Sequence, residues 1–133
     1  MKRRQKFNSG STSNLQRRCF ALAKAAEAEG WLVATGDKEK LNGKKVNEFL
    51  LIPEQAKANG KVEQDARYTA DIILYLKSRE STRIVIDTKS KPTAKLADYV
   101  LRRKLMLQVH KIEITEIHSL SEMQDLIAGL RNI

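Results

Sequence analysis

Residues 83–89, Arg-Ile-Val-Ile-Asp-Thr-Lys, constrain the fold of this chain more than any other segment. The unbroken run of Ile and Val is typical of a strand that is buried on both faces. Asp87 and Lys89 are two positions apart, so on a strand they share one face. A buried strand that ends in a carboxylate and an amine is costly unless the pair has a function. The segment therefore predicts an interior strand that ends at a polar site.

A second apolar run, residues 68–76, has Asp71 near its start. The five residues 77–81 separate the two runs, which is a suitable length for a hairpin connection. If the runs pair across this turn, Asp71 lies close to Asp87 and Lys89. The sequence thus predicts two carboxylates and one lysine at one edge of a hairpin.

The first half of the chain contains one clear helix. Residues 14–29 have apolar positions three or four apart and form an amphipathic helix, with Ser11, Thr12 or Ser13 as its N-cap and Gly30 at its end. Residues 31–34 are either a short strand or the packed exit of this helix, and residues 35–45 form a loop. Residues 46–52 are expected to be a strand, and residues 54–66 a mobile loop beside the site with a turn at Asn59-Gly60.

The second half alternates between helices and strands. A helix is expected to begin within residues 90–93 and to continue to residue 109. Residues 111–117 alternate apolar and polar side chains, as in a strand with one buried face. A final helix covers residues 119–130, capped by Ser119 or Ser121. A strand that follows a crossover helix should lie parallel to the strand before it. The fold class is therefore α/β, with a small mixed sheet flanked by helices and an extra C-terminal helix.

The chain has 133 residues, which suits one domain over residues 14–133 after a flexible basic segment, residues 1–13. No window is apolar enough for a membrane span, and the basic N-terminus lacks the apolar stretch of a secretory signal. One cysteine, Cys19, excludes an internal disulfide and fits a reducing compartment, so a cytoplasmic location is expected. One cysteine and two histidines make a structural zinc site improbable.

Positive charge is concentrated around the candidate site. The formal net charge is +9, and residues 77–104 carry nine basic but only three acidic side chains. This asymmetry favours a polyanionic partner, most simply DNA, although a solubilising surface is the plain alternative. The candidate contacts to nucleic acid are Arg17, Arg18, Lys91, Lys95, Arg102, Arg103 and Lys104.

Paired carboxylates without a nearby Cys or His suit a hard, oxygen-preferring cation such as Mg²⁺ or Mn²⁺. A lysine two residues beyond such a carboxylate can stabilise the charge that builds up on a phosphate. Asp71, Asp87 and Lys89 together indicate metal-assisted hydrolysis of a phosphodiester. The alternative is a salt-bridged strand edge without catalytic function, because the pattern itself is short.

The αβββαβ order, with Asp71 and the Asp-x-Lys motif on the second and third strands, resembles the PD-(D/E)XK nuclease superfamily. Residues 68–72, 84–89, 101–105 and 112–114 are similar to a family of short, phage-encoded, Holliday-junction-resolvase-like proteins, and residues 49–53 match the first strand of that family. The resemblance covers residues 7–117. It implies a restriction-endonuclease-like core and a Mg²⁺-dependent DNA endonuclease, structure-selective or junction-resolving, in phage DNA recombination, repair or packaging.

The resemblance also assigns roles to individual residues. It implies that Asp71 and Asp87 are metal ligands, that the Thr88 carbonyl completes the coordination shell, and that Lys89 is the catalytic lysine. The first helix of the family usually starts Ser-x-x-Glu and uses its Glu as a further ligand. Asn14 stands at that position here and brings no charge, so Glu48 or Glu54 would have to substitute.

Two other functions remain open on the sequence. A nuclease fold with a degraded site would bind DNA without cutting it, and Asn14 is the best support for this alternative. A protein-interaction factor, such as an inhibitor of a host nuclease, would need no DNA. Junction resolution would require a homodimer, for which residues 111–117 and the last helix are candidate faces. Trp31 and the tyrosines are interpreted as core or rim residues, and His110 and His118 as surface residues.

Overall fold

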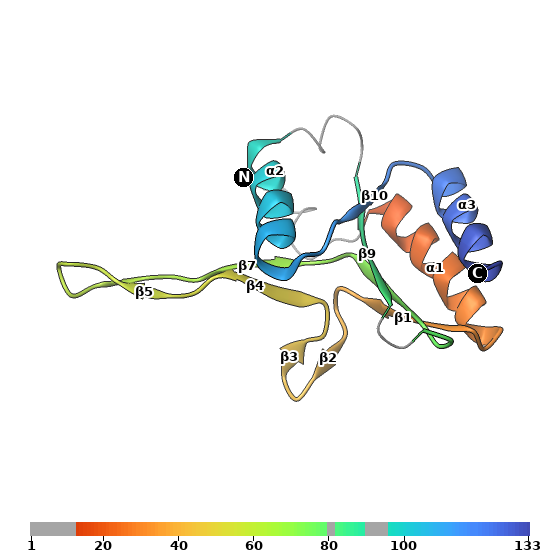
Figure 1. Ribbon diagram of the computed structural model, residues 1–133, viewed down its shortest axis with the longest axis horizontal. Helices are drawn as coiled ribbons and strands as arrows, with labels where there is room; N and C mark the ends of the chain where they lie inside the picture. Colours follow the sequence, from red (N-terminus) through yellow and green to blue (C-terminus); the bar gives the residue numbers. More distant parts are fainter. Residues whose placement is uncertain (1–12, 80–81, 90–95) are drawn as a thin grey trace, which may run out of the picture.

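A four-stranded mixed sheet forms the centre of the computed structural model, which describes residues 13–79, 82–89 and 96–133 (Figure 1). The strand order is β1 (Leu32–Gly36), β8 (Ile72–Leu76), β9 (Arg83–Thr88) and β10 (Thr115–Ile117). β8 pairs antiparallel with both β1 and β9, which confirms the predicted hairpin. β10 lies parallel to β9, as the crossover rule requires. The protein is thus an α/β structure with a small mixed sheet flanked by helices.

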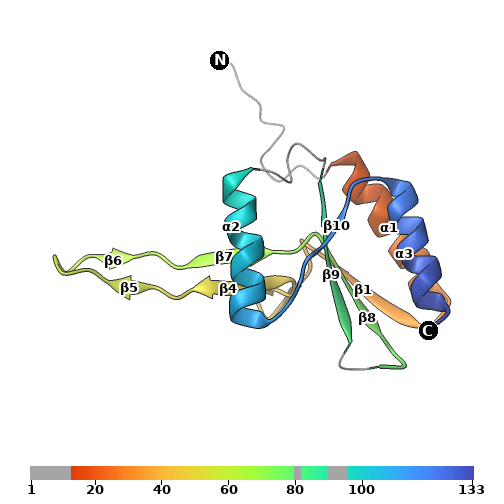
Figure 2. The ribbon, with the colours of Figure 1, turned by 45° about the horizontal axis from the view of Figure 1, so that its top comes forward.

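Two helices cover one face of this sheet. α1 (Asn14–Ala28) and α3 (Leu120–Arg131) lie side by side in both ribbon views (Figures 1 and 2). Their apolar faces join one side of the sheet in a core that includes Cys19, Ala23 and Met123. Ser13 caps α1 and Ser119 caps α3, each by accepting a hydrogen bond from the backbone N–H three residues on. Both caps are among the serines that the sequence offered.

The opposite face of the sheet packs against a second core. α2 (Ala97–Leu105) continues into a π-helical turn, η3 (Met106–His110), and both lie on the other side of the sheet from α1. Alternate residues of the central strands divide between the two cores: Ile72 and Ile86 enter the first, and Ile73 and Val85 the second. The central strands are therefore buried on both faces, as the continuous apolar runs predicted.

The predicted strand over residues 68–76 is wrong as a single unit. It is divided into β7 (Ala66–Thr69), which pairs with β4 (Glu48–Ile52), and β8, which belongs to the central sheet. Buried Asn47 holds the junction, since its side chain donates to the carbonyls of Ala70 and Thr35 at 3.2 and 3.0 Å. Consequently β1, not the 46–52 segment, is the first strand of the central sheet.

The strand predicted over residues 46–52 is present as β4, but the predicted loop over residues 54–66 instead belongs to a long two-stranded arm that spans residues 48–69. Beyond β4 and β7 the arm continues as β5 (Gln55–Ala56) and β6 (Val62–Glu63), and it extends away from the body in both views (Figures 1 and 2). Gly60, with φ +83°, forms the predicted turn at its tip. A smaller hairpin, β2 (Lys40–Leu41) and β3 (Lys44–Lys45), lies in the predicted 35–45 loop.

Of the remaining predicted boundaries, the helix start within residues 90–93 lies outside the described residues. Of the predicted strand over residues 111–117, only β10 is a strand. Lys111 ends η3 in a left-handed conformation (φ +60°), and Ile112 donates its N–H back to Met106, so this stretch packs into the second core before the ladder begins. No helix within the described ranges is long and apolar enough to cross a membrane.

Candidate active site

Asp87 reaches the site from the interior of the molecule. It follows buried Val85 and Ile86 on β9 and is itself only 3% exposed. The Tyr68 hydroxyl donates to its Oδ2 at 2.7 Å. Its Oδ1 is buried without a hydrogen-bond donor from the described residues, and the Lys89 ammonium forms only a 3.4 Å ion pair with it. A buried carboxylate oxygen without a donor is uncommon, and it indicates a position where a cation would be stabilised.

Asp71 lies at the start of β8, beside the end of β9. Its Oδ2 accepts hydrogen bonds from the Thr88 N–H at 2.8 Å and the Thr88 hydroxyl at 2.9 Å, which fix the carboxylate at this edge of the sheet. Burial, and then the negative charge of Asp87, raise the pKa of Asp71 to about 7, against the opposing effect of the Thr88 bonds. The charge of Asp87 is therefore close enough to hinder the ionisation of Asp71.

Tyr68 keeps its proton at this site. Burial, and then the charge of Asp87, raise the pKa of its phenol far above the ordinary value. The hydroxyl is therefore a permanent donor to Asp87, and it orients the carboxylate so that Oδ1 is the oxygen without a donor. Interpreting the tyrosines as core or rim residues missed this function.

Glu116 organises the surroundings of Lys89. It is level with Asp87 in the parallel β9–β10 pair, and it accepts hydrogen bonds from Tyr99 at 2.9 Å and Arg103 at 2.8 Å. Although burial raises the pKa of Glu116, these hydrogen bonds outweigh it and hold the pKa below the ordinary value. The Tyr99 ring, fixed in this way, lies 4.6 Å from the Lys89 ammonium in a cation–π contact.

His118 completes this arrangement from the end of β10. Its Nδ1 lies 2.6 Å from the Lys89 carbonyl oxygen, and because a carbonyl only accepts, Nδ1 carries the proton. Its Nε2 lies 3.5 Å from a Glu116 oxygen. The side chain is 19% exposed, so His118 is partly buried at the edge of the site. Glu116 and His118 could have been found from sequence by noting that a strand parallel to β9 must end beside Asp87.

The three predicted residues open into one cleft of about 340 Å³ between β7 and α2. Asp71, Asp87 and Lys89 all line it, as the hairpin argument predicted. Two arginines stand at its sides. Arg67 is held by Asp65 at 2.9 Å and Glu48 at 3.3 Å, and Arg102 pairs with Asp98. These cations are positioned by neighbouring carboxylates, and they offer a polyanion two fixed guanidinium groups.

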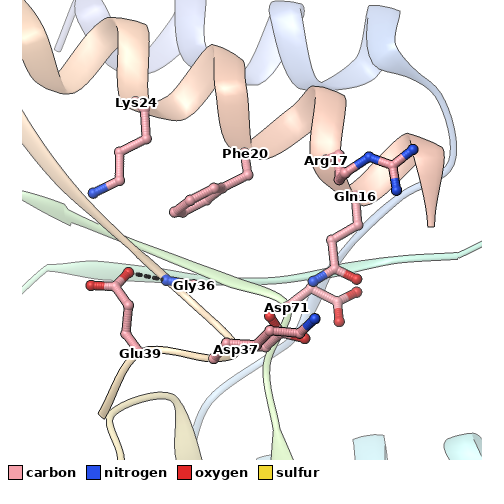
Figure 3. A pocket seen from close by; sticks show the side chains of 9 residues that line it. Gln16, Arg17, Phe20, Lys24, Gly36, Asp37, Glu39 and Asp71 are labelled. Carbon is pink, nitrogen blue, oxygen red and sulfur yellow. Dashed lines mark hydrogen bonds between the residues drawn. The ribbon is translucent and has the colours of Figure 1, made fainter. Parts of the chain in front are cut away.

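A second cleft, of about 390 Å³, adjoins the other side of Asp71 (Figure 3). It lies between α1, which contributes Gln16 and Phe20, and the loop after β1, which contributes Asp37. A Cβ on Gly36 would stand 3.2 Å from the Phe20 ring, so glycine permits this close approach. Asp71 lines both clefts and therefore faces two openings.

The first helix presents a different residue from the one expected. Asn14 is the first residue of α1 and accepts a hydrogen bond from Arg17 at 2.6 Å, but it is not among the residues that line either cleft. Gln16 points down from the helix into the second cleft instead (Figure 3). Arg17 lines that cleft, whereas Arg18 is exposed elsewhere on the helix.

The other predicted contacts are distributed over α2. Arg102 lines the cleft of Asp87, whereas Arg103 and Lys104 line a separate hollow on the helix. Lys91 and Lys95 lie outside the described residues. The two substitute carboxylates are not in the cleft: Glu48 binds Arg67 at the base of the arm, and Glu54 is exposed farther along it.

The donor set fits a small divalent cation. In the described part of the chain no three His, Cys, Asp or Glu side chains gather as a complete metal site. Asp71 and Asp87 do form a close pair, in which one buried oxygen of Asp87 has no hydrogen-bond donor and burial and the charge of Asp87 raise the pKa of Asp71. A cation would pair with the donor-free oxygen of Asp87 and would offset the repulsion between the two carboxylates. Mg²⁺ commonly binds through one or two carboxylates while keeping several waters. Asp71 and Asp87 are the residues that would hold it.

Comparisons of the chain with protein-family models, curated proteins and solved structures return no match. Its function must therefore be inferred from the chemistry of this cleft.

Proposed function

We propose that the protein is a metal-dependent DNA endonuclease with a restriction-endonuclease-like core. The observation that carries the proposal is the buried, donor-free Oδ1 of Asp87, with Asp71 beside it and the Lys89 ammonium 3.4 Å away. When β2–β7, which lie outside the central sheet, are set aside, the order α1, β1, β8, β9, α2, β10 is consistent with the αβββαβ order of PD-(D/E)XK nucleases and supports this core. The net charge of +9 supports a polyanionic substrate.

Each residue of the cleft has a distinct task in this mechanism. Asp71 and Asp87 hold the cation, Thr88 fixes Asp71, and Tyr68 fixes Asp87. The cation, when bound, polarises the scissile phosphate and lowers the pKa of a water. Lys89 stabilises the negative charge that develops on the phosphate oxygens, and the Tyr99 ring keeps its ammonium at the cleft.

A cleavage assay tests the proposal. Labelled linear duplex, single-stranded, flap and four-way junction DNA are incubated with the protein and Mg²⁺ or Mn²⁺. Lys89→Ala is assayed alongside Lys77→Ala, a matched control on the exposed β8–β9 turn. Cutting by the wild type and the control, but not by Lys89→Ala, is the expected result, and the preferred substrate shows whether the enzyme is structure-selective. Equal cutting by both lysine variants would contradict the assigned role of Lys89.

One observation favours a second candidate function, a DNA-binding protein whose nuclease site has lost its chemistry. α1 contributes the amide of Gln16 near Asp71, not a carboxylate, so the site has two acidic groups where the resembling family has three. Calorimetric titration with Mg²⁺ separates the two candidates. Millimolar or tighter binding that disappears in Asp71→Asn supports the enzyme, whereas DNA binding without Mg²⁺ binding supports the second candidate.

A further inference from the structure

Two polar side chains enter the second cleft without a partner. The Gln16 amide projects into it from α1, and the Asp37 carboxylate enters it from the loop after β1 (Figure 3). Neither side chain forms a hydrogen bond or an ion pair with any residue that the structure describes, whereas the Glu39 carboxylate accepts from the Gly36 N–H. An amide and a carboxylate that enter one cleft without protein partners can bind the polar edge of a ligand.

An aromatic side chain forms the apolar part of the same cleft. The Phe20 ring projects into it from α1, one turn beyond Gln16, and it is only partly buried (Figure 3). Proteins commonly bind a single nucleobase by packing it against an aromatic ring and bonding its edge to a few polar groups. The volume of about 390 Å³ lies within the range of small-ligand sites. The cleft therefore has the components of a nucleobase site.

The charge of the cleft distinguishes a base from a phosphate. Three cations and three carboxylates line it: Arg17, Lys24 and Lys38, and Asp37, Glu39 and Asp71. A phosphate would gain little net attraction from this balanced lining, and it would meet the charges of Asp37 and Asp71. A nucleobase is neutral and carries its N–H and C=O groups at its edge, so the balanced lining suits it.

Asp71 connects this cleft to the candidate active site, because it lines both. We propose that the second cleft holds one unpaired base of the DNA strand whose phosphate lies at Asp71, Asp87 and Lys89. In an intact duplex this base is paired and stacked, and it can enter a pocket only by leaving the helix at a cost in free energy. The preferred substrate is then DNA with an unpaired nucleotide at the position of cutting, such as a flap, a bulge or a single strand. The inference rests on the proposed function, which places the phosphate in the first cleft.

A binding experiment tests the cleft separately from cleavage. Fluorescence anisotropy without divalent cations measures the affinity of the full chain for a duplex with one unpaired guanine and for the same duplex without it. The bulged duplex should bind about tenfold more tightly. Gln16→Ala and Phe20→Leu should each reduce this preference, whereas Gln124→Ala, at an exposed glutamine on α3, should leave it unchanged.

The identity of the unpaired base tests the role of Asp37. A carboxylate only accepts hydrogen bonds, and guanine offers two adjacent N–H groups, whereas thymine presents one N–H between two carbonyls. Unpaired guanine should therefore bind about tenfold more tightly than unpaired thymine. Asp37→Asn keeps the shape of the side chain and should remove most of this difference. Equal affinity of wild type for the two bases would overturn the assigned contact with Asp37.

The same measurements distinguish this inference from the proposed function. Equal affinity for the bulged and the fully paired duplex would overturn the inference, as would a preference that Gln16→Ala and Phe20→Leu both leave unchanged. A preference that both variants reduce, in a protein that cuts no DNA with Mg²⁺ or Mn²⁺, would support the base site and contradict the nuclease.

Discussion

At the scale of single residues, the site is defined by two carboxylates that lie close together in a largely buried position. Asp87 is almost fully buried, and Asp71 is held against Thr88 with its pKa raised to about 7. Both carboxylates have donors, Thr88 for Asp71 and Tyr68 for Asp87, but Oδ1 of Asp87 is buried without one from the described residues, which is uncommon for a purely structural carboxylate. The charge of Asp87 raises the pKa of Asp71, and a cation bound by both carboxylates would remove this repulsion.

The pH dependence of stability follows from the raised pKa of Asp71. Between its ordinary value of 3.8 and about 7, the folded protein binds a proton that the unfolded chain does not. The contribution of Asp71 to stability is therefore complete below about pH 4 and is lost as the pH rises to about 7. Asp71→Asn keeps the acceptor for Thr88 and removes the titration. At pH 8 without metal, its Tm should exceed that of wild type by roughly 5 °C.

Thermal unfolding of both proteins at pH 5 and pH 8, with and without Mg²⁺, checks this prediction. The difference in Tm between the variant and wild type should shrink at pH 5. Mg²⁺ should stabilise wild type more at pH 8 than at pH 5, because the ionised carboxylates bind it. Identical pH slopes for the two proteins would show that Asp71 does not titrate in this range.

Glu116 is predicted to be a positioning residue. Glu116→Gln retains the shape of the side chain but weakens the bonds that fix Tyr99 and Arg103, so Lys89 loses its support. If the proposed function is correct, kcat should fall about tenfold with little change in KM. Mg²⁺ binding, measured by calorimetry, should be unchanged. Glu113→Gln, at an exposed position just before β10, is the control, and an equal loss in both variants would remove the assigned role.

At the scale of elements, the sequence was most informative where local pattern and sheet geometry agree. The β-branched run before Asp87 predicted β9, and the spacing to Asp71 predicted the hairpin that brings both carboxylates into one cleft. The rule that a strand following a crossover helix lies parallel to the strand before it predicted that β10 is parallel to β9. These features depend on a few residues near one another in the chain or on a rule that holds for any sheet.

The division of the 68–76 run could not be predicted in this way. Both halves are apolar and suited to strands, so local propensity contains no signal for a break. The break is fixed by tertiary contacts, in which the Asn47 side chain binds the carbonyls of Thr35 and Ala70 and accepts from the Thr35 hydroxyl at 2.7 Å. The partners of Tyr68 and Tyr99 could not be predicted for the same reason. Tyr68 on β7 bonds Asp87 on β9, and Tyr99 on α2 bonds Glu116 on β10, so both bonds depend on tertiary contacts.

Asn47 should therefore contribute strongly to stability. Asn47→Ala leaves two buried backbone carbonyls without a donor, and the free energy of unfolding should fall by about 2–3 kcal/mol. Urea denaturation measures this loss. Asn132→Ala, an exposed asparagine that bonds only the Ala128 carbonyl of its own helix, should change stability by no more than about 0.5 kcal/mol. Similar losses in both variants would contradict the assignment of Asn47 as the residue that holds the junction.

At the scale of the whole molecule, the excess positive charge and the extended arm belong to different parts of the chain. The chain has a net charge of +9, whereas residues 48–67, which extend from the body as the arm, carry four carboxylates and three cations (Figure 1). Outside the arm the chain therefore carries an excess of positive charge, which is the feature that a polyanionic partner would recognise.

Binding to DNA should accordingly depend steeply on salt. Affinity for a duplex, measured by fluorescence anisotropy, should fall roughly a hundredfold between about 50 and about 200 mM salt. Arg102→Gln, in the cleft, should reduce the slope of log affinity against log salt by about one, whereas Lys45→Gln on β3 should leave it unchanged. A shallow slope for wild type would argue against contacts with the phosphate backbone.

The junction between β7 and β8 has a mechanical consequence. Only Ala70 separates the last residue of the arm base, Thr69, from Asp71, and Asn47 holds Ala70 at both its N–H and its carbonyl. A force on the arm therefore reaches the backbone of Asp71, a carboxylate of the site, through a single residue. A molecule that holds the arm in place should also restrict the motion of Asp71.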